Sequence, residues 1–432
     1  MRILFVTAFY PPYVIGGWEQ LVRDINSQLR SRGHTTQVIT SNYGVGTTPF
    51  QQSGVKRLLQ LESDLVHYDI KDFLLNNRKR IQENVQIVEE SVRSFDPDVV
   101  FIHVMWNLTR AVAWQVEQMC PDRVVYYIAN DWPYAPNVHR AFWSSPGARP
   151  LRRFLKKLLA PIAEGLIEQE AEKYPLQFRH VLAVSQAIKR DLVKNAQIPE
   201  ENIDVVYNGV EVDLFTPREE LREEGIGLSL LYAGSLVSHK GVHTAIQALA
   251  FLKDQDSLDD MQLTIVGSGH PEYEQSLHKL VDESNLEGRV FFWPRVPREE
   301  MPLLLRKFDV LVFPSLWDEP LARMMQEAMA CGLLVVGTPT GGTPEILKDG
   351  ETGLTFPPGD AKALASQLQR LLKDHELRDK LSHNARRIVE SKFSLTRMVD
   401  EIEEHLEAVA EQRKREGGCQ SVQEVDRIEA TK

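Results

Sequence analysis

The chain has few cysteines, no long apolar run and a deficit of positive charge. Its 3 cysteines in 432 residues (Cys120, Cys331 and Cys419) match neither a disulfide framework nor a metal-ligand spacing, which fits a reducing compartment. No apolar run approaches the roughly 20 residues that span a bilayer, and the apolar start Met1–Ala8 is too short for a signal sequence. The net charge of −11 argues against general nucleic-acid binding. These absences predict a cytoplasmic protein with no nucleic-acid partner.

Length and residue pattern favour two α/β domains. A chain of 432 residues exceeds one ordinary core, and 43% hydrophobic residues are typical of a globular protein. Candidate strands alternate with helical stretches, as in parallel sheets. These strands are Ile3–Thr7, Thr36–Thr40, Val99–His103, Val124–Ile128, Val181–Val184, Ser229–Ala233, Leu263–Val266, Val290–Phe292, Val310–Phe313 and Leu334–Gly337. Residues 41–97 look less regular, and we interpret their loop Gly44–Pro49 as a flap.

The domain boundary is predicted near residue 217. The segment Tyr207–Pro217 separates the two series of strands and leads into a charged stretch. We therefore predict an N-terminal domain at 1–217, a C-terminal domain at 218–393 and a final helix at 394–411. The tail at 412–432 is polar without apolar periodicity, which predicts disorder.

Two carboxylates eight residues apart carry the most chemical information, Glu319 and Glu327. Pro320 suits the first turn of a helix and Gly332 its end. We expect Glu319 at the helix start and Glu327 about two turns inside, on the order of 12 Å along the axis. A helix start can seat a diphosphate, and carboxylates on either side of it can accept hydroxyl hydrogen bonds. That layout fits a nucleotide sugar, although two solvated helix positions are the alternative.

This region resembles the retaining glycosyltransferases of family 4, which have the GT-B fold. The Glu-x7-Glu pattern is followed by the apolar run Leu333–Thr338, the Gly341-Gly342 turn, and the stretches Asp349–Leu354 and Pro357–Asp360, all in the family's style. The resemblance covers nearly the whole chain. It implies an α/β protein of two facing Rossmann-like domains with a cleft between them. It also implies an acceptor-side N-terminal domain, a nucleotide-sugar-binding C-terminal domain and a final helix that crosses back to the first domain.

The resemblance also implies an activity. It predicts a retaining, metal-independent hexosyl- or glycosyltransferase without a cofactor, which moves a sugar from a nucleoside diphosphate sugar to a hydroxyl acceptor in glycan, glycolipid or polysaccharide biosynthesis. A sugar-nucleotide epimerase of similar build is one alternative. A catalytically silent scaffold that binds sugar nucleotide or glycan is the other. The sequence leaves open the donor's base and sugar and the identity of the acceptor.

The resemblance assigns specific roles in the donor site to one basic residue and two acidic residues. Glu319 holds the donor sugar, Glu327 accepts from the ribose hydroxyls, and Lys240 balances the charge of the diphosphate. The other implied donor-binding residues are Gly17, Gly234, Ser235, Gly267, Arg295, Leu321, Ala322 and Arg323.

One donor position departs from the family pattern. Relatives often have arginine after the glycine that corresponds to Gly234, whereas this chain has Ser235, which supplies a hydroxyl without a charge. This departure motivates the scaffold alternative. Arg323, four residues after Glu319, is our candidate for the missing charge, and an ordinary exposed helix arginine is the alternative.

The implied acceptor side follows two strand ends. His103 ends a strand and is expected to hold sugar or acceptor hydroxyls, or simply to cap a loop. Asn130 and Asp131 replace the His-Asp of many relatives; an amide cannot take up a proton, so Asp131 is left to orient or deprotonate the acceptor. Three nearby tryptophans can stack on sugar rings or pack in the core: Trp106, Trp132 and Trp143.

The stretch Arg149–Leu159 holds five basic residues and no acid. A helix there would show a cationic face beside an apolar one, which predicts peripheral contact with the inner face of a membrane that carries a lipid-linked acceptor. An ordinary amphipathic helix packed on the domain is the alternative.

Overall fold

The computed structural model describes residues 1–45, 52–65, 67–145, 150–218, 227–254 and 261–411. The chain forms two compact units. Unit 1 comprises Met1–Val184, Ile188–Val206 and the residues from Val399 onward, and unit 2 comprises Ser185–Ala187 and Tyr207–Met398. Cys419, the residues of the expected flap from Gly46 on, Arg149 and the expected tail from 412 lie outside the described residues.

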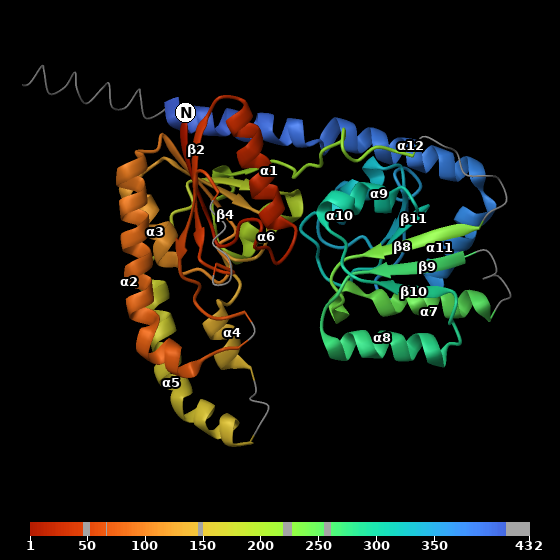
Figure 1. Cartoon of the computed structure of the whole chain (residues 1–432), viewed down its shortest axis with the longest axis horizontal. Helices are drawn as coiled ribbons and strands as arrows, with labels where there is room; N and C mark the ends of the chain where they lie inside the picture. Colours follow the sequence, from red (N-terminus) through yellow and green to blue (C-terminus); the bar gives the residue numbers. More distant parts are fainter. Residues whose placement is uncertain (46–51, 66, 146–149, 219–226, 255–260, 412–432) are drawn as a thin grey trace, which may run out of the picture. The chain divides into compact units, whose positions relative to one another are not determined.

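Unit 1 is built on a parallel sheet with the strand order β3-β2-β1-β4-β5-β6-β7. Helices cover both faces of it (Figure 1). The central strands are therefore continuous apolar runs, as parallel sheets require, and Ile3–Val6 of β1 are fully buried. The strands are β1 (Arg2–Thr7), β2 (Thr35–Ser41), β3 (Val55–Leu59), β4 (Val99–His103), β5 (Val124–Ile128), β6 (His180–Ala183) and β7 (Ile203–Val205).

The helices of unit 1 include one that corrects an expectation. The described residues of 41–97 include the strand β3 and the 26-residue helix α2, so much of this region is regular. Asp69 starts this helix, and its carboxylate accepts hydrogen bonds from the N–H groups of Lys71 and Asp72. The helices are α1 (Trp18–Ser31), α2 (Ile70–Phe95), α3 (Arg110–Met119), α4 (Val138–Ser144), α5 (Pro150–Lys173), α6 (Gln186–Asn195, whose first two residues group with unit 2) and the 3-10 turn η1 (Glu200–Asn202).

Unit 2 repeats this plan with a parallel sheet of order β10-β9-β8-β11-β12-β13. Its strands are β8 (Leu228–Ala233), β9 (Met261–Val266), β10 (Val290–Trp293), β11 (Val310–Phe313), β12 (Leu334–Gly337) and β13 (Leu354–Thr355). Its helices are η2 (Ser238–Lys240), α7 (Val242–Lys253), α8 (Pro271–Glu283), η3 (Arg298–Glu300), α9 (Met301–Leu305), α10 (Arg323–Ala330), η4 (Thr343–Glu345), α11 (Ala361–Lys373) and α12 (His375–Lys392).

The last described helix occupies residues 395–411, and its part from Val399 belongs to unit 1. Ion pairs hold that part on unit 1. Arg32, just after α1, pairs with Asp400 at 2.7 Å and with Glu403, and His34 Nε2 lies 2.5 Å from a Glu403 oxygen. This helix therefore contacts residues that lie more than 360 positions earlier in the chain.

The predicted α/β class is confirmed, and each predicted strand is present to within two residues. The strands β3, β7 and β13 were missed, because they lie at the sheet edges and are only five, three and two residues long. Among the described residues, no helix combines the length and the apolar character that a bilayer crossing needs.

Candidate active site

The side chain of Glu319 is the centre of a small polar cluster in unit 2. Glu319 follows β11 and is 5% exposed. One carboxylate oxygen accepts from Lys240 Nζ at 2.6 Å and from Ser315 Oγ at 2.7 Å. An ion pair and a hydroxyl together hold the carboxylate in one orientation. The sequence predicted both charged members of the cluster, but it did not predict Ser315.

The loop that carries Lys240 is fastened to the loop after β11. The Leu316 N–H donates to the His239 carbonyl at 2.8 Å, and Lys240 Nζ lies 5.7 Å from the centre of the Trp317 ring. Burial and the neighbouring Lys240 charge lower the pKa of His239, so its imidazole is neutral near neutral pH. The positive charge of the cluster therefore comes from Lys240.

The Gly341-Gly342 turn fixes the backbone of Glu319. Gly342 N–H donates to the Glu319 carbonyl at 2.7 Å, and Gly341 N–H donates to Asp318 Oδ1 at 3.0 Å. Gly341 has a φ of 55°, and a Cβ there would lie 2.3 Å from the Glu319 oxygen. Only glycine meets both demands, so this turn is a positioning element for the carboxylate.

The expected helix start at Pro320 was wrong. Helix α10 begins at Arg323, with Ala322 as its N-cap. The Glu319 carbonyl is bonded to Gly342 N–H and is therefore not the start of a helical ladder. Glu319 consequently lies in the loop before the helix, and Glu327 lies one turn inside it.

Glu327 is buried and paired with an arginine that sequence reasoning missed. Its side chain is 3% exposed and forms an ion pair with Arg298 from η3. Arg323 also approaches it, with Nε 3.9 Å from the same carboxylate oxygen, and the Arg323 side chain is only 9% exposed. The exposed-arginine alternative for Arg323 is therefore wrong. No sequence signal joined Arg298 to Glu327, since 29 residues separate them.

The glycines at the ends of β8 and β9 have a packing role. Gly267 has a φ of 150°, and a Cβ there would lie 1.9 Å from the Gly234 carbonyl oxygen. Gly234 N–H in turn donates to the Val266 carbonyl at 3.0 Å. We had expected Gly267 to admit the nucleotide; the close approach in the structure is to the backbone of the neighbouring strand end.

The remaining predicted donor residues differ in exposure. Ser235 and Arg295 are exposed in the loops after β8 and β10. Leu321 is buried, and its carbonyl accepts from Asn208 Nδ2 at 3.4 Å. Since all strands of this sheet are parallel, the loops after β8, β9, β10, β11 and β12 meet at its carboxyl edge. The structure thus brings the predicted donor residues of unit 2 to one edge.

His103, on unit 1, is completely buried at the carboxyl end of β4. Its Nδ1 lies 2.6 Å from the Tyr127 carbonyl. Burial lowers the pKa of His103 to about 4, against the opposing effect of backbone hydrogen bonds to Tyr127 and Trp18. The ring is therefore neutral near neutral pH, which suits an orienting role.

The loop before α1 contains a carboxylate of its own. Gly17, one of the implied donor-binding residues, is the N-cap of α1. The Glu19 carboxylate accepts from the N–H groups of Ile15 at 3.2 Å and Gly16 at 3.0 Å. Glu19 is 2% exposed, so the protein supplies its own negative charge there.

The predicted acceptor-side residues have unequal surroundings. Asn130 is 2% exposed, and its Oδ1 has no hydrogen-bond partner in the described part of the chain. The Asp131 carbonyl accepts from Tyr134 and Ala135 N–H groups. Trp132 is 8% exposed and packs on Phe178 with ring centres 5.7 Å apart. Trp143 is also buried, so core packing is favoured for both of these tryptophans, whereas Trp106 is 41% exposed.

The predicted basic helix is present as α5, with a different surface from the one expected. Lys156 is buried, and its Nζ donates to the carbonyls of Phe142 and Ser145. The exposed face carries apolar side chains, with Phe154 at 65% and Leu158 at 64% exposure, beside the exposed Lys157. Lys156 is therefore not part of an exposed cationic face.

Comparisons with known proteins agree with these features. The family model described as Glycosyltransferase Family 4 matches residues 15–214, and the one described as Glycosyl transferases group 1 matches residues 217–388. N-acetyl-alpha-D-glucosaminyl L-malate synthase of Bacillus anthracis is 32% identical over 418 residues, which is 93% of this chain and 96% of that protein.

Other relatives match over less of their length. D-inositol 3-phosphate glycosyltransferase of Corynebacterium aurimucosum is 28% identical over 65% of this chain, and spore coat protein SA of Bacillus subtilis is 30% identical over 51% of it. The matched region spans 65% and 63% of those two relatives, slightly less than two thirds of their length.

Solved structures share the fold. The glycosyltransferase from Rickettsia africae superposes with a TM-score of 0.70 at 21% identity and covers 94% of this chain and 98% of its own. Anabaena Alr3699/HepE, solved in complex with UDP, gives a TM-score of 0.68 at 22% identity and covers 94% of this chain and 100% of its own. At these identities the likeness shows the fold, which is of the GT-B class, as predicted.

Proposed function

Because this chain belongs to glycosyltransferase family 4, we propose that it transfers a sugar from a nucleoside diphosphate sugar to a hydroxyl acceptor with retention of configuration. The observation that carries the proposal is the buried cluster of Glu319, Lys240 and Ser315 at the carboxyl edge of the sheet in unit 2. Open α/β sheets bind ligands at that edge.

Lys240 and the N-terminus of α10 stabilise the negative charge of the donor diphosphate. The Lys240 ammonium neutralises diphosphate oxygens, and N–H groups at the first turn of α10 face the negative charge that grows on the leaving nucleotide. The helix start is open to this use, since Ala322 makes no side-chain cap hydrogen bond. Glu319 accepts hydrogen bonds from hydroxyls of the donor sugar and so keeps the reacting carbon in place.

Glu327 accepts from the ribose hydroxyls, with Arg298 holding its carboxylate in one orientation. Arg323 supplies a second positive charge, in place of the arginine that Ser235 lacks, when it turns from Glu327 toward the phosphates. A comparison of Arg323→Ala with Lys240→Ala tests this role. Wild-type turnover in Arg323→Ala would end it.

The acceptor side orients and does not abstract a proton. Burial lowers the pKa of His103 to about 4, so its neutral ring is a weak base, and the amide of Asn130 takes up no proton. In the proposed front-face reaction, the acceptor hydroxyl forms the new bond to the sugar carbon, the sugar–phosphate bond breaks, and the proton passes to the leaving phosphate oxygen. No protein base of shifted pKa is needed for that step.

A panel of UDP-, GDP- and ADP-sugars tests the proposal, with binding and slow hydrolysis measured for wild type and Glu327→Ala. UDP-sugars come first, because two similar solved structures are complexes with UDP and with UDP-glucose. Cleavage of one donor that weakens in the variant supports the transferase. Binding without cleavage, even after acceptor screening, would favour a scaffold, and no binding would refute the proposal. EDTA should leave turnover unchanged, since the proposed reaction uses no metal ion.

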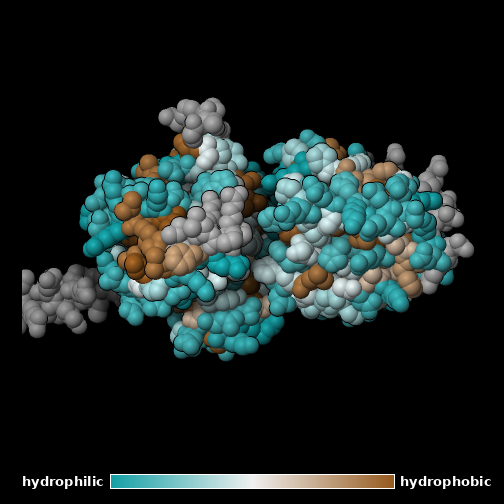
Figure 2. All heavy atoms as spheres, turned by 90° about the horizontal axis from the view of Figure 1, so that it is seen from below, coloured by the Kyte–Doolittle hydropathy of each residue, from teal (hydrophilic) through white to brown (hydrophobic). Residues whose placement is uncertain are grey.

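We also propose peripheral membrane contact through α5. Phe154, Leu158 and Ile162 recur every four residues and are 60–65% exposed, so they form one apolar stripe on the helix. The exposed Lys157 lies beside it. Figure 2 shows hydrophobic residues gathered on the left-hand unit, which carries α5. An apolar stripe flanked by basic residues fits an anionic lipid surface.

Flotation with anionic and neutral vesicles tests this contact. Wild type should float with anionic vesicles, and Phe154→Ser/Leu158→Ser should lose most of that binding. Leu75→Ser is the matched control, because Leu75 is 78% exposed on α2 of the same unit. Equal flotation of the α5 variant and wild type, or no flotation at all, would refute the proposal.

A further inference from the structure

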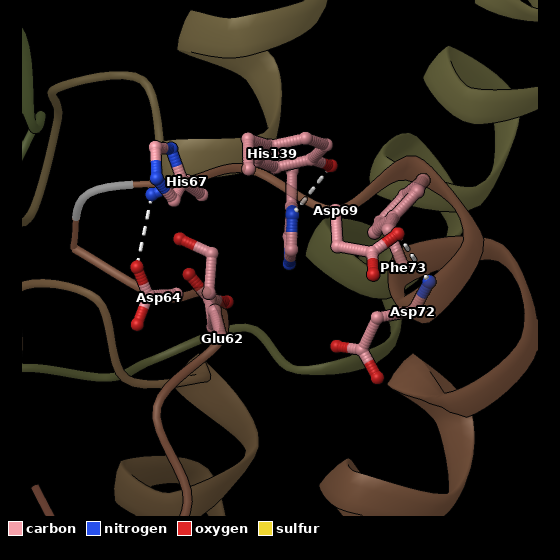
Figure 3. Close-up of a pocket in the computed structure, with 9 residues that line it drawn as sticks. Glu62, Asp64, His67, Asp69, Asp72, Phe73 and His139 are labelled. Atoms are coloured by element: carbon pink, nitrogen blue, oxygen red, sulfur yellow. Dashed lines mark hydrogen bonds between the residues drawn. The ribbon is translucent and has the colours of Figure 1, made fainter.

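Unit 1 contains a cavity of about 230 Å³ that sequence reasoning did not find. It lies between the loop residues 62–64 and 67–69, the first turn of α2 and the helix α4 (Figure 3). Its lining is rich in acids and histidines and contains two aromatic rings: Glu62, Ser63, Asp64, His67, Tyr68, Asp69, Asp72, Phe73 and His139. We name it the acidic pocket.

The acidic pocket lies on the same sheet edge as His103. The loop after β3 is bonded to the loop after β4: Glu62 N–H donates to the Asn107 carbonyl at 2.9 Å, and Asn107 Nδ2 donates to the Ser63 carbonyl at 2.8 Å. Because β3 and β4 belong to one parallel sheet, both loops leave its carboxyl edge. The pocket is therefore on the edge where unit 1 carries its candidate acceptor residues.

His139 points an unpartnered nitrogen into the pocket. The residue is 1% exposed, and its Nδ1 lies 2.8 Å from the Tyr68 hydroxyl, which also accepts from Trp143 Nε1 at 3.2 Å. Its Nε2 is buried and has no hydrogen-bond partner among the described residues. Figure 3 shows this end of the ring directed at the space between Glu62 and Asp72. A buried nitrogen without a partner costs stability, so a ligand that bonds to it gains affinity.

The charge of the pocket is negative. None of its lining residues is a lysine or an arginine. Burial, helped by the charge of Glu170, raises the pKa of Glu62 to about 8, so Glu62 is largely protonated near neutral pH. Burial, helped by Arg80, lowers the pKa of His139 to about 3, so that ring is neutral. The carboxylates of Asp64, Asp69 and Asp72 remain. Two arginines near the pocket oppose them: Arg80 pairs with Asp72 at 2.7 Å, and the charge of Arg110 acts on Glu62.

These charges exclude some ligands. An anion would meet three carboxylates, which repel it. A single metal ion also fits poorly. Among the described residues, the one group of three His, Cys, Asp or Glu side chains with ligand atoms within 4.8 Å of one another is His34, Glu403 and Glu407, which is outside the pocket. A cation larger than a metal ion that also carries hydrogen-bonding groups fits both the carboxylates and the unpartnered nitrogen of His139.

We propose that the acidic pocket binds the ammonium group of a small hydroxylated amine, such as an amino sugar, and that this amine is the acceptor of the transfer. The ammonium donates to the carboxylates and to His139 Nε2, and Tyr68 and Phe73 cover the apolar face of the ring. The ammonium group serves to bind the acceptor and is not the nucleophile, since a hydroxyl of the same molecule forms the new bond. The acceptor role rests on the proposed transferase function, whereas the binding does not.

Calorimetric titration of the full chain without donor tests the binding. The probes are glucosamine, N-acetylglucosamine and glucose, which share one ring and differ in the charge at one position. We expect glucosamine to bind at least about tenfold more tightly than the other two, as a charge-assisted hydrogen bond predicts. Asp69→Asn should weaken glucosamine binding by about tenfold, because asparagine keeps the helix cap and removes the charge. His139→Gln should also weaken it.

Asp360→Asn is the matched control. Asp360 caps α11 of unit 2 through the same kind of bond, to the N–H of Ala363, and lies in the other unit. It should leave glucosamine binding unchanged. Equal binding of the three sugars, no binding of glucosamine, competition by magnesium ions, or wild-type binding in both pocket variants would each overturn the proposal.

The acceptor role has a separate readout. With a donor identified, glucosamine or a related amine should accelerate donor consumption, and Asp69→Asn should raise the KM for the amine, whereas the control Asp360→Asn should leave that KM unchanged. Binding with no acceleration by any amine would refute the acceptor role alone. Failure of every donor to bind would refute the transferase and leave the pocket measurement intact.

Discussion

The two units place their polar residues on the same kind of sheet edge but hold them differently. In unit 2, backbone hydrogen bonds and glycine contacts fasten neighbouring loops together, as at Gly341 and Gly267. In unit 1, backbone bonds such as Glu62 N–H to the Asn107 carbonyl are joined by side-chain contacts: the Asn107 amide binds the neighbouring loop, and His139 lies over the acidic pocket. A site made by backbone leaves glycine motifs in a sequence, whereas a site made by side chains leaves a scatter of ordinary polar residues.

The largest expected effect is on donor hydrolysis, which should depend on unit 2 and not on unit 1. Glu319→Gln should lower donor hydrolysis by a hundredfold to a thousandfold, because the neutral amide loses the Lys240 ion pair and the hold on the donor sugar. Asp131→Asn in unit 1 should change hydrolysis without acceptor by less than about twofold. Steady-state kinetics in both variants checks this. Equal losses would show that the division of labour between the units is wrong.

The next prediction tests the backbone-built edge of unit 2. Gly341→Ala should lower the free energy of unfolding by about 3 kcal/mol, since its Cβ would meet the Glu319 backbone and its φ is positive. Gly350→Ala is the matched control: its φ is 70° with nothing within 4 Å of the added Cβ, so about 1 kcal/mol is expected. Urea unfolding measures both. Similar losses would mean that the contact with Glu319 contributes nothing.

Removing an ion pair from each unit should change the free energy of unfolding by an intermediate amount. Arg298→Met should cost about 2 kcal/mol of unfolding free energy, because the buried Glu327 carboxylate then keeps the 3.9 Å approach of Arg323 but loses its ion pair with Arg298. Arg93→Met in unit 1 should cost less than about 0.5 kcal/mol, because the Arg93–Glu89 pair is exposed. Adding Glu327→Gln to Arg298→Met should restore part of the loss. A double variant less stable than Arg298→Met would contradict the assignment.

The buried histidine of unit 1 predicts a dependence on pH. The pKa of His103 falls from its ordinary value near 6.5 to about 4 in the folded state. The unfolded chain therefore binds the proton first as pH falls, and stability that is present above pH 6.5 is lost between pH 6.5 and 4. From pH 7 to 5 the loss from this group is on the order of 2 kcal/mol. His103→Gln should flatten the unfolding free energy over that interval, and an unchanged slope would contradict the assignment.

The smallest expected effect tests the departure from the family at position 235. Ser235→Arg should raise donor affinity by a few-fold, since it adds a positive charge to the exposed loop after β8. The gain should shrink as salt rises. Competition binding with the nucleoside diphosphate measures the donor affinity. Weaker binding in the variant would indicate that Arg323 already occupies the position beside the phosphates.

Sequence reasoning succeeded where local rules are strong. Runs such as Val99–His103 and Val310–Phe313 were predicted to the residue, because buried parallel strands are continuous apolar stretches. It failed at Pro320, where a residue favourable to a helix start is overruled by the bond of the Glu319 carbonyl to Gly342. It also failed at β3 and β13, whose pairing with neighbours decides their conformation more than their own composition does.

For the candidate site too, sequence reasoning predicted some residues and missed others. Glu319, Lys240 and Glu327 were found from motif and spacing, and the structure joins the first two at 2.6 Å. Arg298 and Ser315 were not found, and neither was any residue of the acidic pocket. The pocket joins the loop residues 62–64 and 67–69 to His139, some 70 residues later in the chain.

By itself the sequence determined the α/β class and the family and selected Glu319 and Glu327 as candidate carboxylates, because these depend on short-range patterns of apolar residues, glycines and acids. The tertiary structure alone decided which partner each carboxylate has, where α10 begins and that unit 1 encloses an acidic pocket. Those features depend on contacts between segments far apart in the chain, and burial in such contacts sets the pKa of Glu62 and of both buried histidines.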